Sequence, residues 1–425
     1  MGKRANTTLQ SAFFSLANVL PQAEAIEYMK DAATKSYLKK GQNVVDMNHK
    51  AIDAGATAFV MVDVPDSWKS ATDDASTERI EGSAAVTKQV KDIMQPINTM
   101  NGYDIPVSAF VDHADGQFEL GISAYEKCGV AVTVPRWDSE ICIQCNNCAY
   151  VCPHATIRPF ALTEEEAKNA PAAAKIVDVK AGKGKGVYKY TMAISPLDCM
   201  GCAVCVGQCP VGALTMVPQE QEAAQQDVFN YMVANVAAKE DVADLTVKGS
   251  QFKKPLLEFS GSCAGCAETA YARLVTQVAG DRMFISNATG CSSIWGNPAA
   301  TAPYCKDKDG HGPAWNNSLF EDNAEHGLGM AVGYEAVQKK LIAATQDIIA
   351  ADGPSDELKA AGQAWIDSVN DAEASKTAAA AYVAELEKCG CDASKAILAD
   401  KAYLTKKSFW IFGGDGWAYD IGFGG

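Results

Sequence analysis

The sequence lacks the features that would place it in several broad classes of protein. Its 425 residues contain no run of 18 apolar residues, so no transmembrane helix is expected and no membrane partner. Positive charge is scarce, since the sequence has 37 basic and 52 acidic residues and a formal net charge of −15. Nucleic acid is therefore not an expected partner, because phosphates require a basic surface. Because 48% of the residues are hydrophobic and 21% charged, whole-chain disorder is excluded, and the length suggests roughly two to three domains.

A secretory signal peptide is not expected at the start of this sequence. The basic residues Lys3 and Arg4 precede a mildly apolar stretch, but polar side chains interrupt it. Its apolar residues, Leu9, Phe13, Leu16 and Leu20, recur at helical spacing and predict an amphipathic helix that ends at Pro21. At the other end, the chain stops in a glycine-rich stretch directly after a predicted strand. Folded domains rarely end in this way, so we expect an internal piece of a longer chain.

The hydrophobic pattern predicts a multi-domain α/β chain. Residues 1–65 show a helix, a helix and a strand, and the apolar segments at 44–45 and 58–62 flank a helical stretch around residues 48–54. Residues 66–118 are polar, so we expect a linker or small domain with little core. Residues 119–248 contain two cysteine tracts separated by an insertion at 154–198. From residue 249 to 425, predicted helices (269–278 and 327–404) alternate with short strands (283–286 and 408–412), which is typical of an α/β domain.

Cysteine is abundant, with 15 residues, and eight of them form two tracts with the same spacing. The tracts are Cys142, Cys145, Cys148, Cys152 and Cys199, Cys202, Cys205, Cys209, each ending in Cys-Pro. In this pattern three cysteines hold one [4Fe–4S] cluster and the fourth holds the other cluster. We therefore predict one cluster on Cys142, Cys145, Cys148 and Cys209, and a second on Cys199, Cys202, Cys205 and Cys152. Zinc sites use Cys-x-x-Cys pairs without a third cysteine and a spaced fourth, and nothing in the sequence favours disulfides.

Four lysines, Lys180, Lys183, Lys185 and Lys189, lie among glycines in the insertion. A docking patch for an acidic electron acceptor is one interpretation. We favour a solvated hairpin, because runs of charge usually cover a solvated surface.

A second kind of site begins at Cys263 and Cys266, followed by Cys291 25 residues later. Taken alone, these three cysteines fit a metal site and buried thiols equally well. Further along, Gly414, Asp415 and Gly416 follow an apolar strand. A strand, a glycine-rich turn and an acid suit a diphosphate held through Mg²⁺, although such turns are common in proteins.

In their order and spacing these motifs resemble the pyruvate:ferredoxin oxidoreductase family of thiamine-diphosphate enzymes. The resemblance is carried by the start of the chain (Asn6 to Gln10), both cysteine tracts, Cys263 to Glu268, Thr289 to Ser293, Pro313 to Glu325 and Gly413 to Gly425. It covers essentially the whole chain. It implies that residues 1–65 are the end of a gamma-like domain of 2-oxoacid oxidoreductases, that 119–248 are a bacterial 2[4Fe–4S] ferredoxin-like α+β domain, and that 249–425 are the first part of a thiamine-diphosphate domain. In the family, the remaining domains lie before Met1 and after Gly425.

The resemblance also implies roles for individual residues. Cys263, Cys266 and Cys291 would ligate a cluster close to thiamine diphosphate, and Glu268 and Cys291 would touch that cofactor. The diphosphate would be held by Gly414, Asp415, Gly416 and Trp417, with Asp415 on Mg²⁺. Asn6 and Asn48 would face coenzyme A, although any isolated Asn is more often simply a polar helix residue. Cys128, Cys305, Cys389 and Cys391 match no ligand position and are interpreted as ordinary thiols.

The activity implied is oxidative decarboxylation of pyruvate with coenzyme A to acetyl-CoA and CO₂, with electrons leaving through [4Fe–4S] clusters to ferredoxin or flavodoxin. A cytoplasmic setting in anaerobic metabolism is expected, and a homo-oligomer at full length. The alternatives are a stand-alone iron–sulfur electron carrier and an oxidoreductase for another 2-oxo acid. A carrier has no use for a diphosphate site, so the Gly413 to Gly425 segment argues for the enzyme. We expect the 425 residues alone to be inactive.

Overall fold

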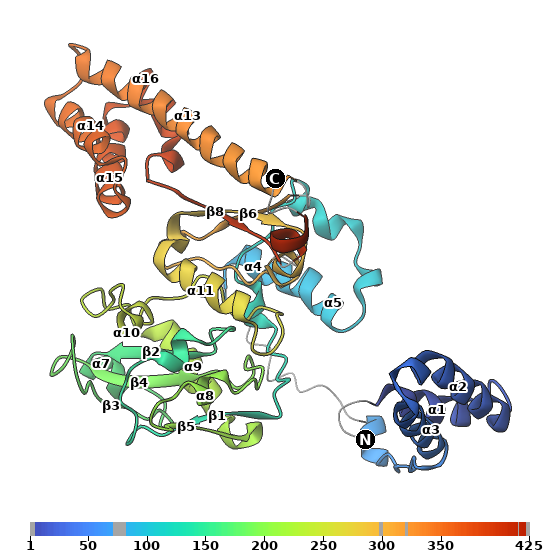
Figure 1. Ribbon diagram of the computed structural model, residues 1–425. Helices are drawn as coiled ribbons and strands as arrows, with labels where there is room; N and C mark the ends of the chain where they lie inside the picture. Colours follow the sequence, from blue (N-terminus) through green and yellow to red (C-terminus); the bar gives the residue numbers. More distant parts are fainter. Residues whose placement is uncertain (1–4, 71–81, 297–300, 319–321, 415, 422–425) are drawn as a thin grey trace. The chain divides into compact units, whose positions relative to one another are not determined.

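The computed structural model describes residues 5–70, 82–296, 301–318, 322–414 and 416–421 (Figure 1). The chain divides into two compact units, residues 1–79 and 80–425. Mixed helix and sheet make up the second unit, and helices make up the described part of the first. No described helix is long and apolar enough to cross a membrane.

The first unit is a bundle of α1 (Asn6–Ala17), α2 (Gln22–Tyr37) and α3 (Gln42–Thr57). The helices α1 and α3 contact each other through small residues. A Cβ on Gly55 would lie 2.3 Å from the carbonyl oxygen of Thr8, and Ser11 Oγ donates a 2.6 Å hydrogen bond to the carbonyl of Ile52. Two sequence predictions are wrong here. The apolar segment at 44–45 belongs to α3, and residues 58–62 form no strand.

The predicted apolar face of α1 also behaves differently from expectation. Leu9, Phe13 and Leu16 are 56–65% exposed, whereas the packed face carries Ser11. Helical spacing identified the helix correctly, but the close α1–α3 contact at Gly55 selects small side chains for the interface.

The second unit begins with helical turns that have a core of their own. The helix α4 (Ala84–Gln89) runs through a π-helical turn (Val90–Met94) into α5 (Gln95–Asn98), and short 3₁₀ segments follow at Gly102–Asp104, Val107–His113 and Ile122–Tyr125. Val90, Met94 and Ile122 are buried together. Within residues 66–118, Val90 and Met94 belong to this small core.

The cysteine tracts lie between two small antiparallel sheets. One pairs β1 (Thr133–Trp137) with β5 (Leu214–Pro218), and the other has the order β2 (Ile157–Leu162), β4 (Lys189–Ile194), β3 (Val177–Asp178). Short helices accompany them: α6 (Asn147–Tyr150), α7 (Glu164–Lys168), α8 (Val204–Gly207), α9 (Gln225–Asn235) and α10 (Val247–Ser250). Residues 154–198 thus supply the second sheet, whose strands β2 and β4 are largely buried.

The lysines of this segment make local contacts rather than extending freely into solvent. Lys180 Nζ donates to the carbonyls of Glu140 (3.0 Å) and Cys142 (2.6 Å). Lys189 pairs with Asp178 at 2.7 Å.

The last part of the chain is built on a parallel sheet of order β7 (Ala314–Ser318), β6 (Met283–Ala288), β8 (Ser408–Phe412). Successive residues of a strand face opposite sides of its sheet. Met283 and Ile285 of β6 accordingly pack with Ala272 of α11 (Ala267–Ala279), whereas Ser286 lies against Gly327 of α13 (Asn323–Ala350). The helices α11 and α13 therefore cover opposite faces, and α12 (Cys291–Gly296) follows β6 directly (Figure 1).

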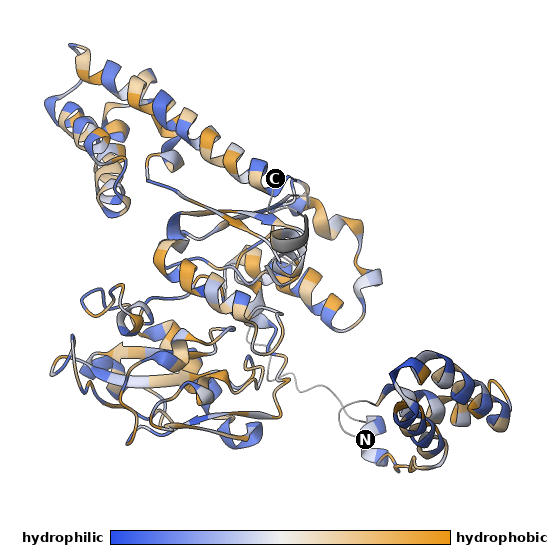
Figure 2. Ribbon diagram, in the orientation of Figure 1, coloured by the Kyte–Doolittle hydropathy of each residue, from blue (hydrophilic) through white to orange (hydrophobic). Residues whose placement is uncertain are grey.

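Four helices between β7 and β8 form a separate hydrophobic cluster. The long α13 packs with α14 (Asp356–Ser368), α15 (Ala372–Cys389) and α16 (Asp392–Ala399) around the buried Trp365, Tyr382 and Leu386. Hydrophobic and hydrophilic residues alternate along α13 (Figure 2), as expected for a helix packed along one side. The predicted helices at 327–404 and the predicted strand at 408–412 are confirmed.

Candidate functional site

The two cysteine tracts follow the same backbone path. Two positions after the first cysteine, the backbone is left-handed at Gln144 (φ 59°) and Gly201 (φ 64°). Four positions after it, the backbone is left-handed again at Asn146 (φ 63°) and Ala203 (φ 60°). Left-handed backbone is uncommon outside glycine. Its repetition at matching positions shows that both tracts curl into the same loop.

Backbone amides of these loops point at the cysteine sulfurs. Such hydrogen bonds favour the thiolate over the thiol, and the thiolate is the form that binds metal. The bonds are Gln144 N to Cys142 Sγ at 3.4 Å, Gly201 N to Cys199 Sγ at 3.4 Å, and Ala213 N to Cys209 Sγ at 3.1 Å.

The folded chain brings the fourth cysteine of each tract to the other tract. Burial, followed by the charges of nearby thiolates, raises the pKa of Cys148, and those neighbours are Cys142, Cys145 and Cys209. Cys148 thus has the last cysteine of the second tract beside it. Buried groups of like charge are unstable together unless a cation lies among them.

The second group of cysteines shows the reciprocal arrangement. Burial comes first in raising the pKa of Cys205, followed by the thiolates of Cys152, Cys148, Cys199 and Cys202. Burial raises the pKa of Cys199 to about 11, and Cys152 and Cys202 again contribute. Cysteines of the two tracts therefore lie close enough for their charges to act on one another.

None of the 15 cysteines, all of which lie in the described part of the chain, forms a disulfide. Among the described residues, no three His, Cys, Asp or Glu side chains converge on one point as ligands of a single metal ion would. A cubic cluster requires a different arrangement, with one sulfur at each of four separate corners.

The loop of Cys263 and Cys266 packs directly on the second tract. A Cβ placed on Gly265, which has φ +78°, would lie 3.8 Å from Cys202 Cβ and 3.6 Å from Val204 Cγ2. Glycine is thus suited to this position both by its backbone conformation and by the close approach. The third cysteine site and the second tract are immediate neighbours.

His154 links the same two regions. It lies two residues after Cys152, is 2% exposed, and its Nδ1 and Nε2 lie 3.1 Å and 3.3 Å from the carbonyl oxygens of Ser260 and Cys263. Burial lowers the pKa of His154, so the neutral ring, with a single N–H donor, is favoured. The imidazole therefore bridges the Cys152 and Cys263 backbones with one hydrogen bond at a time.

A buried ion pair holds β2 against the segment that leads to Cys263. Arg158 (7% exposed) pairs with Glu258 (8%), and its guanidinium lies 5.2 Å from the ring centroids of Phe229 and Phe259. Its Nε also donates to the carbonyl of Ala155 at 2.7 Å. Burial opposes ionisation of Glu258, but the charges of Arg158 and Lys254 and the hydrogen bonds from Arg158 and Cys305 together outweigh it, and the pKa of Glu258 is lowered.

A second buried cation attaches α11 to the first tract. Arg273 is 2% exposed, and its Nη2 donates at 2.5 Å to the carbonyl of Tyr150, between Cys148 and Cys152. Its Nη1 donates to the side-chain oxygens of Gln251 (3.0 Å) and Gln277 (2.8 Å). The helix that begins after Cys266 is thereby fixed to the cysteine loops.

The carboxyl ends of β6 and β8 meet at a glycine contact. A Cβ on Gly290 would lie 3.7 Å from Gly414, and a Cβ on Gly414 would lie 3.2 Å from Cys291 N. In open α/β sheets, ligands bind at this edge, where neighbouring strands connect in opposite directions. The structure thus brings together Cys291 and Gly414, two residues that the sequence predicts to share a site.

Within the described residues, several buried polar atoms around this edge have no hydrogen-bond partner. They are Asn287 Oδ1 at the end of β6, Ser292 Oγ in α12, and Trp417 Nε1 in the π-helical turn Gly416–Ile421. Buried polar atoms are nearly always satisfied in folded proteins. Unpaired ones gathered at a strand edge fit a polar ligand. Asp415, predicted to bind Mg²⁺, lies outside the described residues.

Glu268 occupies the first turn of α11, close to α12. Trp295 Nε1 donates to Glu268 Oε2 at 3.3 Å. Burial raises the pKa of Tyr304, and the charge of Glu268 adds to this shift. The buried Tyr304 hydroxyl also has no hydrogen-bond partner among the residues that the structure describes.

The residues predicted to face coenzyme A do not meet at one point. The contacts of Thr8 with Gly55 and Ser11 with Ile52 show that α1 and α3 are antiparallel. Asn6 therefore lies beside the end of α3, whereas Asn48 is about 13 Å further along that helix at 1.5 Å per residue. Asn48 Nδ2 donates to the carbonyl of Val44 at 2.8 Å, within its own helix.

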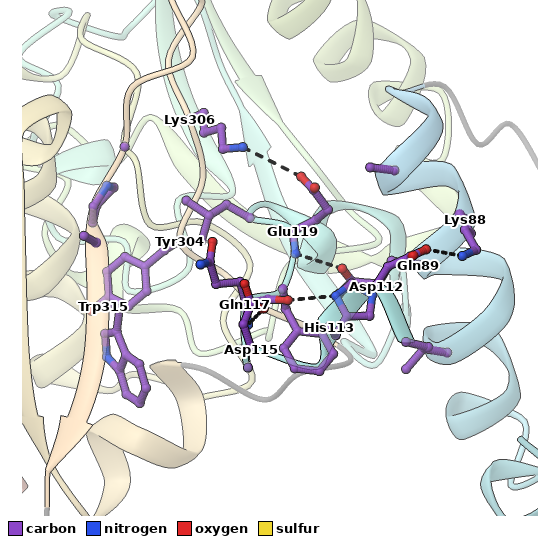
Figure 3. Close-up of a pocket in the computed structure, with 18 of the residues that line it drawn as sticks. Lys88, Gln89, Asp112, His113, Asp115, Gln117, Glu119, Tyr304, Lys306 and Trp315 are labelled. Atoms are coloured by element: carbon purple, nitrogen blue, oxygen red, sulfur yellow. Dashed lines mark hydrogen bonds and ion pairs between the residues drawn. The ribbon is translucent and has the colours of Figure 1, made fainter. Parts of the chain in front are cut away.

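A cavity of about 790 Å³ is lined by Tyr304, which the charge of Glu268 influences, and by residues from 85–120 and 296–316 (Figure 3). None of the predicted site residues lines it. Charged and polar groups on its wall contact one another: Lys88 pairs with Asp112, and Glu119 N donates to Gln89 Oε1 at 2.8 Å.

Comparisons with known proteins identify relatives over the whole chain. Residues 141–213 match a family described as a 4Fe-4S dicluster domain, and residues 76–131 match a domain of unknown function. The whole chain is 44% identical to a pyruvate-flavodoxin oxidoreductase of Enterobacter agglomerans and 45% identical to a pyruvate:ferredoxin oxidoreductase of Moorella thermoacetica. The chain is a relative of these oxidoreductases. It spans 36% of the length of each, and 25% of a pyruvate dehydrogenase [NADP(+)] of Cryptosporidium parvum to which it is 38% identical.

The sequence predictions missed the buried groups that hold these sites together. Arg158, His154 and Arg273 carry no motif. The one available signal was an arginine within the apolar strand 157–162, because charged residues are rarely buried without a partner.

Proposed function

We propose that this chain is part of a pyruvate:ferredoxin (flavodoxin) oxidoreductase. It would join the reaction site to the electron exit of an enzyme that converts pyruvate, coenzyme A and an oxidised carrier to acetyl-CoA, CO₂ and a reduced carrier. The observation that carries the proposal is the contact of the Cys263–Cys266 loop, through Gly265, with Cys202. The Cys263–Cys266 loop thus adjoins the predicted cluster tracts, and Cys291 lies at the glycine-rich edge beside Gly414.

The cysteine tracts would hold two [4Fe–4S] clusters by crossed ligation. One would use Cys142, Cys145, Cys148 and Cys209, and the other Cys199, Cys202, Cys205 and Cys152. The charges of the thiolates support this grouping, because the charge of Cys209 helps to raise the pKa of Cys148 and the charge of Cys152 helps to raise the pKa of Cys205. The residues present fit such clusters, since buried thiolates that repel one another need a cationic centre. Clusters bound there would supply one-electron carriers.

Cys263, Cys266 and Cys291 would serve a third cluster. Gly265 would allow that cluster to approach the second tract closely, and the His154 imidazole would fix the spacing between the two backbones. Arg158 and Arg273 would hold the elements rigid from behind, so that the separation between donor and acceptor stays constant.

Thiamine diphosphate and Mg²⁺ would bind at the carboxyl ends of β6 and β8. The unpaired Asn287, Ser292 and Trp417 atoms fit a polar ligand, and Gly290 and Gly414 leave room for its close approach. Asp415 would ligate Mg²⁺, with Gly416 in the same turn. When bound, thiamine diphosphate supplies the carbanion chemistry that decarboxylates a 2-oxo acid. Glu268, oriented by Trp295, would hold a polar group of the cofactor.

The substrates, partners and location belong to the same proposal. Pyruvate and coenzyme A would be the substrates, with Asn6 and Asn48 facing coenzyme A from separate turns of their helices. Ferredoxin or flavodoxin would accept the electrons, and the full-length protein would be a cytoplasmic homo-oligomer. The relatives' names include both carriers.

The rival function is an electron carrier without catalysis. The unpaired polar atoms beside the Gly290–Gly414 contact favour the enzyme, because a carrier has no ligand to satisfy them.

Metal and sulfide analysis tests the cluster assignment. After anaerobic reconstitution, the two tracts should bind about eight iron and eight sulfide per chain. Cys145→Ala should lose iron, whereas Cys128→Ala, at an exposed cysteine outside the tracts, should keep it. Zinc without acid-labile sulfide would contradict the assignment.

Activity of the full-length protein tests the reaction. Viologen dye should be reduced only when pyruvate, coenzyme A, thiamine diphosphate and Mg²⁺ are all supplied. Reduction with another 2-oxo acid but not pyruvate would identify a different substrate, and reduction with none would favour the carrier.

A further inference from the structure

The junction of α15 and α16 brings two cysteines together. Cys389 is the last residue of α15, Gly390 has a left-handed backbone (φ 60°, ψ 10°), and Cys391 is the N-cap of α16. The left-handed glycine reverses the chain within one residue. As a result, Cys389 Sγ donates a hydrogen bond to Cys391 Sγ at 2.9 Å, and both side chains are exposed.

The surroundings of Cys391 favour a thiolate. Its pKa is lowered to about 7, first by the hydrogen bond from Cys389 and then by hydrogen bonds with Ser394 in the first turn of α16. Cys391 Sγ lies 3.2 Å from Ser394 Oγ, which is itself fully buried.

The other titratable groups near the pair are neutral or paired with one another, so they have little effect on the charge of this thiolate. Burial raises the pKa of Tyr382, and the charge of Cys391 adds to this shift, so its hydroxyl stays neutral. The charged side chains of the junction are paired: Lys388 with Glu385 (2.5 Å), Lys395 with Asp392 (3.5 Å), and Lys401 with Glu387 (3.9 Å).

We propose that Cys389 and Cys391 form a thiol–disulfide exchange site for small disulfides such as glutathione disulfide. The proposal is independent of the oxidoreductase function. The Cys391 thiolate attacks one sulfur of the small disulfide, a mixed disulfide forms, and one small thiolate leaves. Cys389 then loses its proton and attacks Cys391 Sγ, which releases the second small thiolate. Two protein thiols are oxidised and one disulfide is reduced, so no other oxidant is needed.

The chain contains a matched comparison, Cys128. It is also exposed, but burial of its sulfur and the charge of Glu126 raise its pKa to about 11. At pH 7, about half of Cys391 is thiolate, against about one part in 10⁴ of Cys128. Because nucleophilicity falls with pKa, with a Brønsted slope of about 0.45, the net advantage in rate is about 100-fold.

Peptide mapping tests the site. The anaerobic holoprotein is incubated at pH 7 with glutathione disulfide, quenched in acid, alkylated and digested with trypsin. Residues 389–395 and 128–136 fall on separate peptides because each follows a lysine. Peptide 389–395 should lose two hydrogens on oxidation and no longer be alkylated. The rate of this oxidation should be about 100-fold higher than the rate at which peptide 128–136 is modified.

Two variants separate the roles of the cysteines. Cys389→Ser should leave Cys391 carrying one stable glutathione, because no second thiol can displace it. Cys391→Ser should form no intramolecular disulfide, because only one thiol of the pair remains. Both sites are exposed, so unchanged circular dichroism is expected for each. Full alkylation of both cysteines after incubation, or an unmodified Cys391 in folded Cys389→Ser, would overturn the proposal.

Discussion

Removing the positive charge of Arg158 should strongly destabilise the second unit. Arg158 and Glu258 are both less than 10% exposed, so Arg158→Met would leave a buried carboxylate without its partner. Loss of one partner of a buried ion pair typically costs about 3–5 kcal/mol. The exposed pair of Lys340 and Asp400, 3.1 Å apart, provides the control, and Lys340→Met should cost under about 1 kcal/mol.

The loss should depend on pH in a defined direction. In the parent protein, the folded-state pKa of Glu258 is lowered, so its contribution to stability is present above the unfolded-state pKa of about 4.3 and is lost as pH falls through the folded-state pKa. Without Arg158, burial raises that pKa instead. The cost in stability of the variant then becomes smaller as the pH falls and Glu258 takes up a proton. The stability difference should therefore be largest near pH 7 and shrink toward pH 4.

Pulse proteolysis in urea under anaerobic conditions measures the unfolding free energies. The double variant with Arg158→Met and Glu258→Gln should recover most of the loss at pH 7, because no buried charge remains unpaired. A cost below about 1 kcal/mol for Arg158→Met at pH 7, or a difference that does not change with pH, would refute the reasoning.

Three further outcomes follow from the same structure. Cys152→Ala should remove the cluster that Cys199 ligates rather than the cluster of its own tract, so the two tracts should keep about four iron atoms per chain. Electron paramagnetic resonance (EPR) distinguishes the two clusters. Loss of the other cluster would contradict crossed ligation. Gly413→Ala should weaken thiamine diphosphate binding to the full-length protein by about tenfold or more, as measured by calorimetry, because the new Cβ would lie 2.3 Å from the Trp417 ring. Gly329→Ala is the control and should leave binding unchanged, because its Cβ would have no atom within 4 Å. A polypeptide of these 425 residues alone should show no pyruvate-dependent dye reduction while its two clusters still accept electrons from dithionite, and robust turnover would contradict this.

The sequence predicted well the features that depend on local spacing. The strand at 408–412 has the expected bounds, and α11 extends only one or two residues beyond the predicted 269–278. The cysteine tracts were recognisable because cluster ligation demands a fixed spacing and tight loops. The convergence of Cys291 and Gly414 was predicted through family resemblance, and the structure places them in contact.

Features that depend on distant contacts were not predictable. The apolar segment at 58–62 has the composition of a strand, but a strand needs a partner, and no described residue pairs with it. The contact face of α1 is decided by Gly55, more than 40 residues away, and not by the helix's own apolar spacing. The ion pair of Arg158 and Glu258 joins residues 100 positions apart, which a pattern of local periodicity cannot show.

Reduction of the clusters by pyruvate in the full-length protein tests the central claim most directly. The claim is that the site of Cys263, Cys266 and Cys291 connects the reaction edge to the two tracts. Freeze-quench EPR after mixing with pyruvate and coenzyme A should show reduced clusters in the parent protein. In Cys266→Ser, pyruvate should no longer reduce the two tract clusters, although dithionite still does. Reduction by pyruvate at the parental rate in Cys266→Ser would contradict the account.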